Sequence, residues 1–305
     1  MVYGKQNKKV ESVNVLEEEN KMTVPFKVNL TNKVAVVTGG GGVLGSYFAK
    51  ALAECGAKVA ILDLNQEPAD RVANEIKEAG GQAIGVAANV LDREALEKAK
   101  EIVEKELGTC DILLNGAGGN NPRGTTDDEF YNAEEVKKNP ELKTFFELDP
   151  KGVGFVFDLN FLGTLLPSQV FAKAMVGKKG SVIINVSSMN AYTPLTKIPA
   201  YSGAKAAISN FTQWLAVYFA KAGIRVNAIA PGFLVTKQNE KLLFNEDGTP
   251  TARTGKILGS TPMDRFGEPE ELIGGLLFLA SEEAASFITG VVLPIDGGFS
   301  SYAGV

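Results

Sequence analysis

Tyr201 and Lys205 carry side chains that could exchange a proton with a substrate, and they lie in the sequence YSGAK. Residues at i and i+4 share one face of a helix, so a phenol and an ammonium group there point into one space. A nearby cation favours the phenolate and lowers the pKa of a tyrosine from its reference value of about 10. The chain contains no histidine, so any proton chemistry must come from Tyr, Lys, Asp, Glu or Cys. We predict that the lysine and a positively charged cofactor lower the pKa of Tyr201, and a phenol with a lowered pKa can act as acid and base near neutral pH.

A hydroxyl group is predicted close to this pair. The apolar run SVIINV, residues 181–186, has the length and composition of a buried strand. Ser188 follows it at the carboxyl end, thirteen positions before Tyr201. A tyrosine and a lysine four residues apart are common on exposed helix surfaces, so the pair alone is a weak signal. The serine makes a proton-transferring site the better interpretation.

A glycine-rich turn in the N-terminal part of the chain is typical of phosphate binding. The β-branched run at residues 33–38 leads into four glycines, residues 39–42, and then into an amphipathic helix pattern. Glycines allow the backbone to approach a pyrophosphate, and the first turn of a helix supplies N–H donors and a positive dipole. This order of strand, turn and helix predicts a dinucleotide site.

Asp63 predicts which dinucleotide binds. It ends the next strand pattern, residues 58–63, eighteen positions after Gly45, where a carboxylate accepts hydrogen bonds from the adenosine ribose. The same carboxylate repels a 2′-phosphate, and residues 64–66 offer no cation in compensation. We therefore expect NAD rather than NADP as the cofactor.

Strand and helix patterns alternate along the chain, which indicates βαβ units with right-handed crossovers and a parallel sheet. We predict one α/β domain over residues 23–305, of the Rossmann type, with a doubly wound seven-stranded parallel sheet and helices on both faces. Residues 1–22 mix lysine and glutamate without helical periodicity, so we expect a flexible N-terminal extension in which Met22 is an alternative start. The expected strands are residues 33–38, 58–63, 82–88, 111–115, 181–186, 225–230 and 291–295.

Two connections are too long for ordinary links between a strand and a helix, residues 119–152 and residues 233–263. Each begins at the carboxyl end of a strand, which is the edge where open α/β sheets bind ligands. We predict that these connections form the walls of a substrate pocket.

The composition argues against several other kinds of protein. The formal charge of −5 disfavours nucleic acid as the main partner, because neutralising phosphates needs a basic face. No apolar run reaches the roughly 18 residues of a membrane span, and the N-terminus lacks the apolar centre of a secretion signal. Cys55 and Cys110 indicate free thiols in a reduced compartment, so we expect a cytoplasmic protein. The absence of histidine excludes a His-ligated zinc, and we predict no metal site.

Taken together, the motifs resemble the short-chain dehydrogenase/reductase family from about Phe26 to the C-terminus. The resemblance implies the strand order 3-2-1-4-5-6-7 and hydride transfer between a nicotinamide cofactor and a substrate. The matching motifs are TGGGGVLG (38–45), NGAG (115–118), DLNFLGT (158–164), Ser188, YSGAK (201–205) and PGFLVT (231–236).

The resemblance also implies a role for each catalytic residue. Tyr201 is the acid and base, and Ser188 hydrogen-bonds the reacting oxygen. Lys205 holds the nicotinamide ribose and, together with the cationic nicotinamide, tunes the phenol. Asn160 kinks its helix and holds a water that links Lys205 to solvent.

A larger set of residues is implied for the cofactor. Asn89, where the family usually has aspartate, contacts adenine together with Val90, and Leu234 and Thr236 hold the carboxamide. The whole set is Gly39, Gly42, Val43, Leu44, Asp63, Asn89, Val90, Asn115, Ala117, Gly118, Tyr201, Lys205, Pro231, Gly232, Leu234 and Thr236.

The turn itself departs from the family pattern. Val43 stands where the family usually has its second loop glycine, and NNAG is replaced by NGAG. Since a Cβ then lies where the backbone usually has none, we expect a rearranged turn in which Gly42 takes the strained conformation.

Longer stretches resemble one branch of the family, the D-mannonate oxidoreductases or fructuronate reductases. Among them are residues 187–217 and the tail FSSYAGV. The resemblance implies a six-carbon keto acid as substrate, bound by Asn190, Lys197 and Arg123 beside Ser188 and Tyr201. We predict that Lys197 or Arg123 pairs with the carboxylate, and Lys197 is favoured because it lies four residues from Tyr201. The alternative is that both are solvated loop cations.

Two other functions compete with this interpretation. A related polyol or keto-gluconate dehydrogenase is the alternative within the family, because family members change substrate through loop residues. A dinucleotide-binding regulator without turnover is the alternative outside enzymes, and the intact set of Asn160, Ser188, Tyr201 and Lys205 argues against it.

The helices expected near residues 155–175 and 201–222 are apolar on more than one face, so each is predicted to pack against something besides the sheet. The resemblance implies a partner subunit in a homotetramer, whereas the other interpretation is packing against the long connection at residues 119–152.

Overall fold

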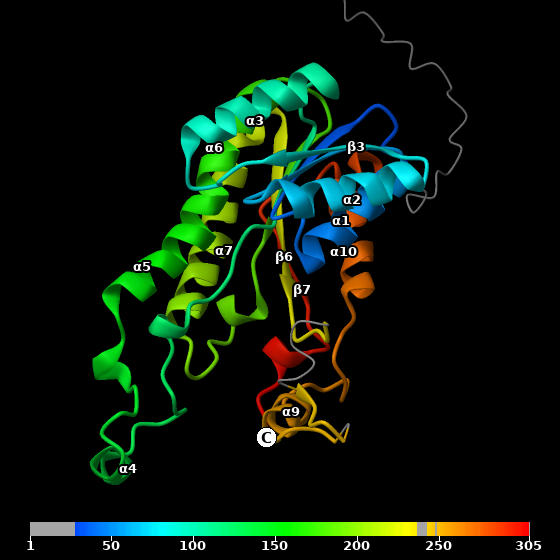
Figure 1. Ribbon diagram of the computed structural model, residues 1–305. Helices are drawn as coiled ribbons and strands as arrows, with labels where there is room; N and C mark the ends of the chain where they lie inside the picture. Colours follow the sequence, from blue (N-terminus) through cyan, green and yellow to red (C-terminus); the bar gives the residue numbers. More distant parts are fainter. Residues whose placement is uncertain (1–27, 237–242, 248, 305) are drawn as a thin grey trace, which may run out of the picture.

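The computed structural model describes residues 28–236, 243–247 and 249–304. The expected N-terminal extension, residues 1–22, and part of the second long connection lie outside the described residues. A parallel sheet of seven strands has the order β3-β2-β1-β4-β5-β6-β7, which confirms the order implied by the sequence (Figure 1). The strands are β1 (Val34–Thr38), β2 (Lys58–Asp63), β3 (Gln82–Ala87), β4 (Ile112–Asn115), β5 (Ser181–Val186), β6 (Ile224–Pro231) and β7 (Val292–Ile295).

Helices cover both faces of the sheet, as predicted. The helices on one face are α1 (Val43–Glu54), α2 (Gln66–Glu78) and α10 (Ile273–Ala280). Those on the other face are α3 (Arg93–Glu106), α6 (Gly163–Met175) and α7 (Pro199–Phe219). The shorter helices are α4 (Ala133–Lys138), α5 (Pro150–Phe157), α9 (Ala252–Gly259) and α11 (Glu282–Ala285).

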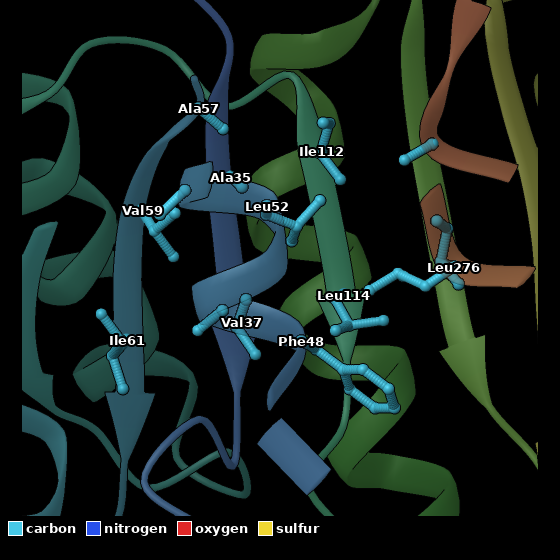
Figure 2. Close-up of a cluster of buried hydrophobic side chains, with 14 of the residues drawn as sticks. Ala35, Val37, Phe48, Leu52, Ala57, Val59, Ile61, Ile112, Leu114 and Leu276 are labelled. Carbon is cyan, nitrogen blue, oxygen red and sulfur yellow. The ribbon is translucent and has the colours of Figure 1, made fainter. Parts of the chain in front are cut away.

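The side chains of β1 show why its sequence is apolar throughout. Ala35 and Val37 belong to the core on the α1 side, whereas Val34 and Val36 belong to the core on the α6 side. Figure 2 shows the first pair close to the side chains of α1, including Phe48. Burying a valine or phenylalanine side chain contributes about 1.5–3 kcal/mol to stability. A strand that is covered on both faces therefore needs apolar residues at every position.

The sequence predicts one helix over residues 155–175, but the structure divides this region. A π-helical turn, Asp158–Leu162, separates α5 from α6, and Asn160 lies within it. The amide of Asn160 donates to the carbonyl oxygens of Val156 and Gly119, each at 2.7 Å. The helix irregularity implied at Asn160 is therefore present, and the side chain ties it to the start of the first long connection.

The combined helical stretch Pro150–Met175 is the one helix among the described residues that is long and apolar enough to cross a membrane. Half of its apolar window is buried inside the protein. Val170, Phe171 and Met175 pack onto the sheet, so the apolar composition has a structural reason within the core.

The described parts of the two long connections contact each other. The first connection contains α4, and the backbone N–H of Thr126 donates to the carbonyl of Lys197 just before α7, at 2.9 Å. The second contains α9, whose Lys256 forms an ion pair with Glu129 of the first connection, at 2.7 Å. Figure 1 places α9 beside the C-terminal residues.

The outward face of α7 carries large apolar side chains. The exposed fractions are 58% for Trp214, 79% for Val217 and 66% for Tyr218. The interpretation that the first long connection covers this face is therefore wrong for these residues.

Candidate active site

The glycine-rich turn between β1 and α1 is built differently from the sequence prediction. Gly39 has φ +64°, which only glycine adopts readily, and a Cβ there would lie 2.9 Å from the Cα of Ala117. Gly42 has φ −73° and ψ 174°, an ordinary extended conformation at the start of α1. The prediction that Gly42 takes the strained conformation is wrong, because Val43 begins the helix and the left-handed residue lies at the exit of β1.

A cavity of about 610 Å³ lies beside this turn. Every residue predicted to bind the cofactor lines this cavity, except Asn115 and Lys205. The predicted residues that line it are Gly39, Gly42, Val43, Leu44, Asp63, Asn89, Val90, Ala117, Gly118, Tyr201, Pro231, Gly232, Leu234 and Thr236. Leu64, Ala88, Leu159 and Phe233 also line it, although they were not among the residues predicted to bind the cofactor.

Asp63 lies in this cavity at the end of β2, as predicted. One of its carboxylate oxygens accepts a hydrogen bond from the backbone N–H of Gly41 at 3.0 Å. This bond fixes the carboxylate beside the glycine turn. The guanidinium of Arg71 donates to the carbonyl of Gly41 at 2.9 Å, which brings a cation to the turn from outside residues 64–66.

Asn89 and Val90 follow β3 at the same edge. The side-chain oxygen of Asn89 accepts from the backbone N–H of Leu91 at 3.0 Å, which orients the amide. Val90 is buried. Both residues line the cavity, and their contact with adenine stays a prediction.

Asn115 does not line the cavity, and its contact with the cofactor stays a prediction. Its amide is buried and donates to Ser168 and Asn185, at 3.0 and 2.9 Å. It holds the end of β4 beneath the site. Thr38, which the sequence analysis did not single out, positions the neighbouring loop, because its hydroxyl accepts the backbone N–H groups of Gly116 and Ala117 at 3.1 and 3.3 Å.

Ser188 and Tyr201 are brought together as predicted. Ser188 follows β5 and Tyr201 lies in the first turn of α7, and the hydroxyl of Ser188 lies close enough to the phenol to act on its pKa. The hydroxyl of Ser188 also accepts the backbone N–H of Asn190 at 3.2 Å. Both residues line the cavity, so the hydroxyl and the phenol are held at one point of its wall.

Lys205 lies directly beneath the cavity. It is 4% exposed, and its ammonium group donates to the carbonyl of Val186 at 2.8 Å and lies 5.5 Å from the ring centre of Tyr201. A Cβ on Gly118, which lines the cavity, would lie 3.2 Å from this ammonium and 2.7 Å from the side-chain oxygen of Asn160. Glycine at position 118 therefore allows the cavity wall to approach both side chains closely.

The pKa values of this pair differ from the sequence prediction. Burial raises the pKa of Tyr201 to about 12, although the hydrogen bond from Ser188 acts in the lowering direction. Burial lowers the pKa of Lys205 to about 8. The predicted lowering of the phenol pKa is therefore wrong for the protein's own groups, because loss of water outweighs the effect of the Ser188 hydroxyl.

The structure separates the three residues predicted to bind the substrate. Arg123 forms an ion pair with Asp149 at 3.2 Å and lines neither this cavity nor the neighbouring one, so its role in binding the substrate stays a prediction. Lys197 lines the neighbouring cavity, and its ammonium donates to the carbonyl of Asp127 at 2.6 Å. Asn190 is buried behind Ser188 and lines neither cavity.

Comparisons with known proteins agree with this geometry. The sequence model of the short chain dehydrogenase family matches residues 33–247. The chain belongs to this family of oxidoreductases.

Individual relatives cover nearly the whole chain. An uncharacterized oxidoreductase of Haemophilus influenzae is 61% identical over 284 residues, which is 93% of this chain and 99% of that protein. A crystal structure of an H. influenzae protein with bound NAD, provisionally described as a D-mannonate oxidoreductase, has a TM-score of 0.89 and 60% identity and covers 93% of this chain and 100% of that one. The 5-keto-D-gluconate 5-reductase of Escherichia coli is 30% identical over 270 residues, 88% of this chain and 96% of that protein.

The residues around the cavity fit a nicotinamide dinucleotide. Gly39 brings the backbone close to the α1 N-terminus, where phosphate is favoured. Asp63 presents a carboxylate at the end of β2, and Ser188 and Tyr201 lie on the same cavity. The glycine turn thus suits a phosphate, Asp63 suits a ribose, and Ser188 and Tyr201 suit the reacting group.

Proposed function

We propose that the protein catalyses NAD(H)-dependent hydride transfer that interconverts D-fructuronate and D-mannonate. The observation that carries the proposal is the placement of Ser188 and Tyr201 on the cavity that fits the dinucleotide. Additional support comes from the NAD bound in the H. influenzae structure and from the description of that protein.

The chain's own residues account for the proton chemistry. NADH, when bound, supplies the hydride. Tyr201 holds its proton up to high pH, because its pKa is about 12, and so it can donate that proton to the carbonyl oxygen of the substrate. Ser188 is fixed by the N–H of Asn190 and donates a second hydrogen bond to the same oxygen. Lys205 contributes a positive charge below Tyr201 that stabilises the phenolate left behind.

A second candidate is a keto-gluconate reductase, which the E. coli relative favours. Fructuronate and 5-keto-gluconate carry the ketone and the carboxylate at the same separation and differ in the configuration of hydroxyl groups. The two candidates therefore require the same catalytic residues and differ in the contacts to the hydroxyls.

Oxidation of NADH by the purified protein separates these possibilities. The panel contains D-fructuronate, 5-keto-D-gluconate and the neutral ketose D-fructose. We expect the highest kcat/KM with fructuronate, and a higher value with keto-gluconate would replace the first candidate by the second. Turnover of none of the three would contradict the proposed function and favour a regulator that only binds the dinucleotide.

We also propose that the protein acts in the cytoplasm as a homotetramer in which the exposed face of α7 meets a second subunit. The apolar side chains of Trp214, Val217 and Tyr218 support this assembly, since such a face is stabilised by removal from water. Light scattering coupled to size-exclusion chromatography measures the number of subunits.

A further inference from the structure

A second cavity of about 830 Å³ adjoins the catalytic residues. Phe233 lines both this cavity and the cofactor cavity, so the two share a wall. Residues 194–198, which connect the Ser188 segment to the first turn of α7, form another part of the second cavity. A substrate that extends away from Tyr201 has space here.

The second cavity carries an excess of positive charge. Among the residues that the structure describes, its charged lining residues are Lys197, Arg253, Lys256 and Glu129. Three cations face one carboxylate, in a chain whose formal net charge is −5. The local charge is thus opposite to that of the whole protein, and it favours an anionic group on the ligand.

The contacts of the three cations distinguish them. Lys256 is paired with the carboxylate of Glu129 at 2.7 Å, and Lys197 donates to the carbonyl of Asp127 at 2.6 Å. Within the described part of the chain, the guanidinium of Arg253 has neither an ion pair nor a hydrogen bond. Arg253 is the second residue of α9. It is exposed and lines the cavity. Its planar fork of donors is free to bind a carboxylate at two points.

We propose that Arg253 binds the carboxylate of the substrate and selects keto acids over neutral ketoses. This inference rests on the proposed function, because it concerns the substrate of that site. In both candidate substrates the carboxylate lies at the opposite end of the carbon chain from the ketone. With the ketone at Tyr201, the chain extends past Phe233 and the carboxylate reaches α9. Arg253 is a specificity-determining residue, and Lys197 contributes a second positive charge.

Steady-state kinetics of Arg253→Met test this inference. The substrates are the preferred keto acid and its methyl ester, which has the same carbon chain without the charge. We expect kcat/KM for the acid to fall about tenfold to hundredfold, mainly through KM, since a charge-assisted hydrogen bond is lost. The ester should be affected much less, and the Kd for NADH should not change. Arg253→Lys retains the charge and should recover part of the loss.

Two further variants serve as comparisons. Arg93→Met makes the same substitution on α3, where Arg93 lies outside both cavities, and should leave both substrates unaffected. Lys256→Met removes a cation already paired with Glu129 and should cost less than Arg253→Met.

The outcomes separate this inference from the proposed function. Equal losses on acid and ester, or a larger loss for Lys256→Met, would overturn the assignment of Arg253 while the proposed function stands. A wild-type enzyme that reduces no keto acid would overturn both.

Discussion

Replacement of Thr38 by valine tests how the end of β1 holds the wall of the cofactor cavity. Valine has the same shape but no hydroxyl, so the backbone N–H groups of Gly116 and Ala117 lose their common acceptor. An unsatisfied buried donor costs about 1–3 kcal/mol. Both N–H groups are only partly buried, so each should cost an amount at the lower end of this range. The free energy of unfolding should therefore fall by about 2 kcal/mol in total.

Thr38→Ser is the matched control. It keeps the acceptor and loses one methyl group from a site that is 0% exposed, at a cost of about 0.8 kcal/mol. With an unfolding entropy of about 2.1 cal/mol/K per residue, each kcal/mol shifts the Tm of a chain of 305 residues by roughly 1.6 °C. The valine variant should therefore unfold about 2 °C below the serine variant.

Two measurements decide the outcome. Thermal unfolding gives the difference in Tm, and fluorescence titration gives the Kd for NADH, which should increase for Thr38→Val because Ala117 lines the cavity. The reasoning is refuted if the serine variant is as unstable as the valine variant and both bind NADH as tightly as the wild type.

Three further predictions concern the site itself. Tyr201→Phe should bind NADH normally and lose nearly all turnover, because no histidine can replace the phenol; substantial activity in a steady-state assay would contradict its role. Asp63→Ala should narrow the preference for NADH over NADPH, measured as the ratio of kcat/KM values, and a wild type that prefers NADPH would contradict the cofactor assignment. The pKa of Lys205 is about 8, so its charge is present below pH 8 and lost above it; kcat/KM for reduction should fall above about pH 8, and a profile flat to pH 10 would exclude this dependence.

Much of the site could be predicted from the sequence because its chemistry depends on local spacing. Tyr201 and Lys205 are one helical turn apart in any helix, and Ser188 follows a strand that any parallel sheet would bury. The strand order followed from the family resemblance, and the sheet confirms it.

What the sequence did not predict has a different origin, since it depends on contacts between distant segments. Asn115 lies at a strand end, and its amide donates to Ser168 and Asn185. Arg123 is a loop cation by sequence, and it forms an ion pair with Asp149. The sequence did not single out Arg253, because its place on the second cavity depends on how α9 lies against residues 194–198. The pKa of Tyr201 depends on burial, which the spacing of two residues does not contain.

The strand order has a consequence for how the chain acquires its structure during translation. β2 pairs with one edge of β1 and β3 extends that side, while β4 pairs with the other edge and β5, β6 and β7 follow in turn. Each new strand therefore joins an edge that is still open, and no pair already formed has to separate. Because domains form from the N-terminus as the ribosome proceeds, the glycine turn and Asp63 can be in place before β5 and α7 bring the residues that move the proton.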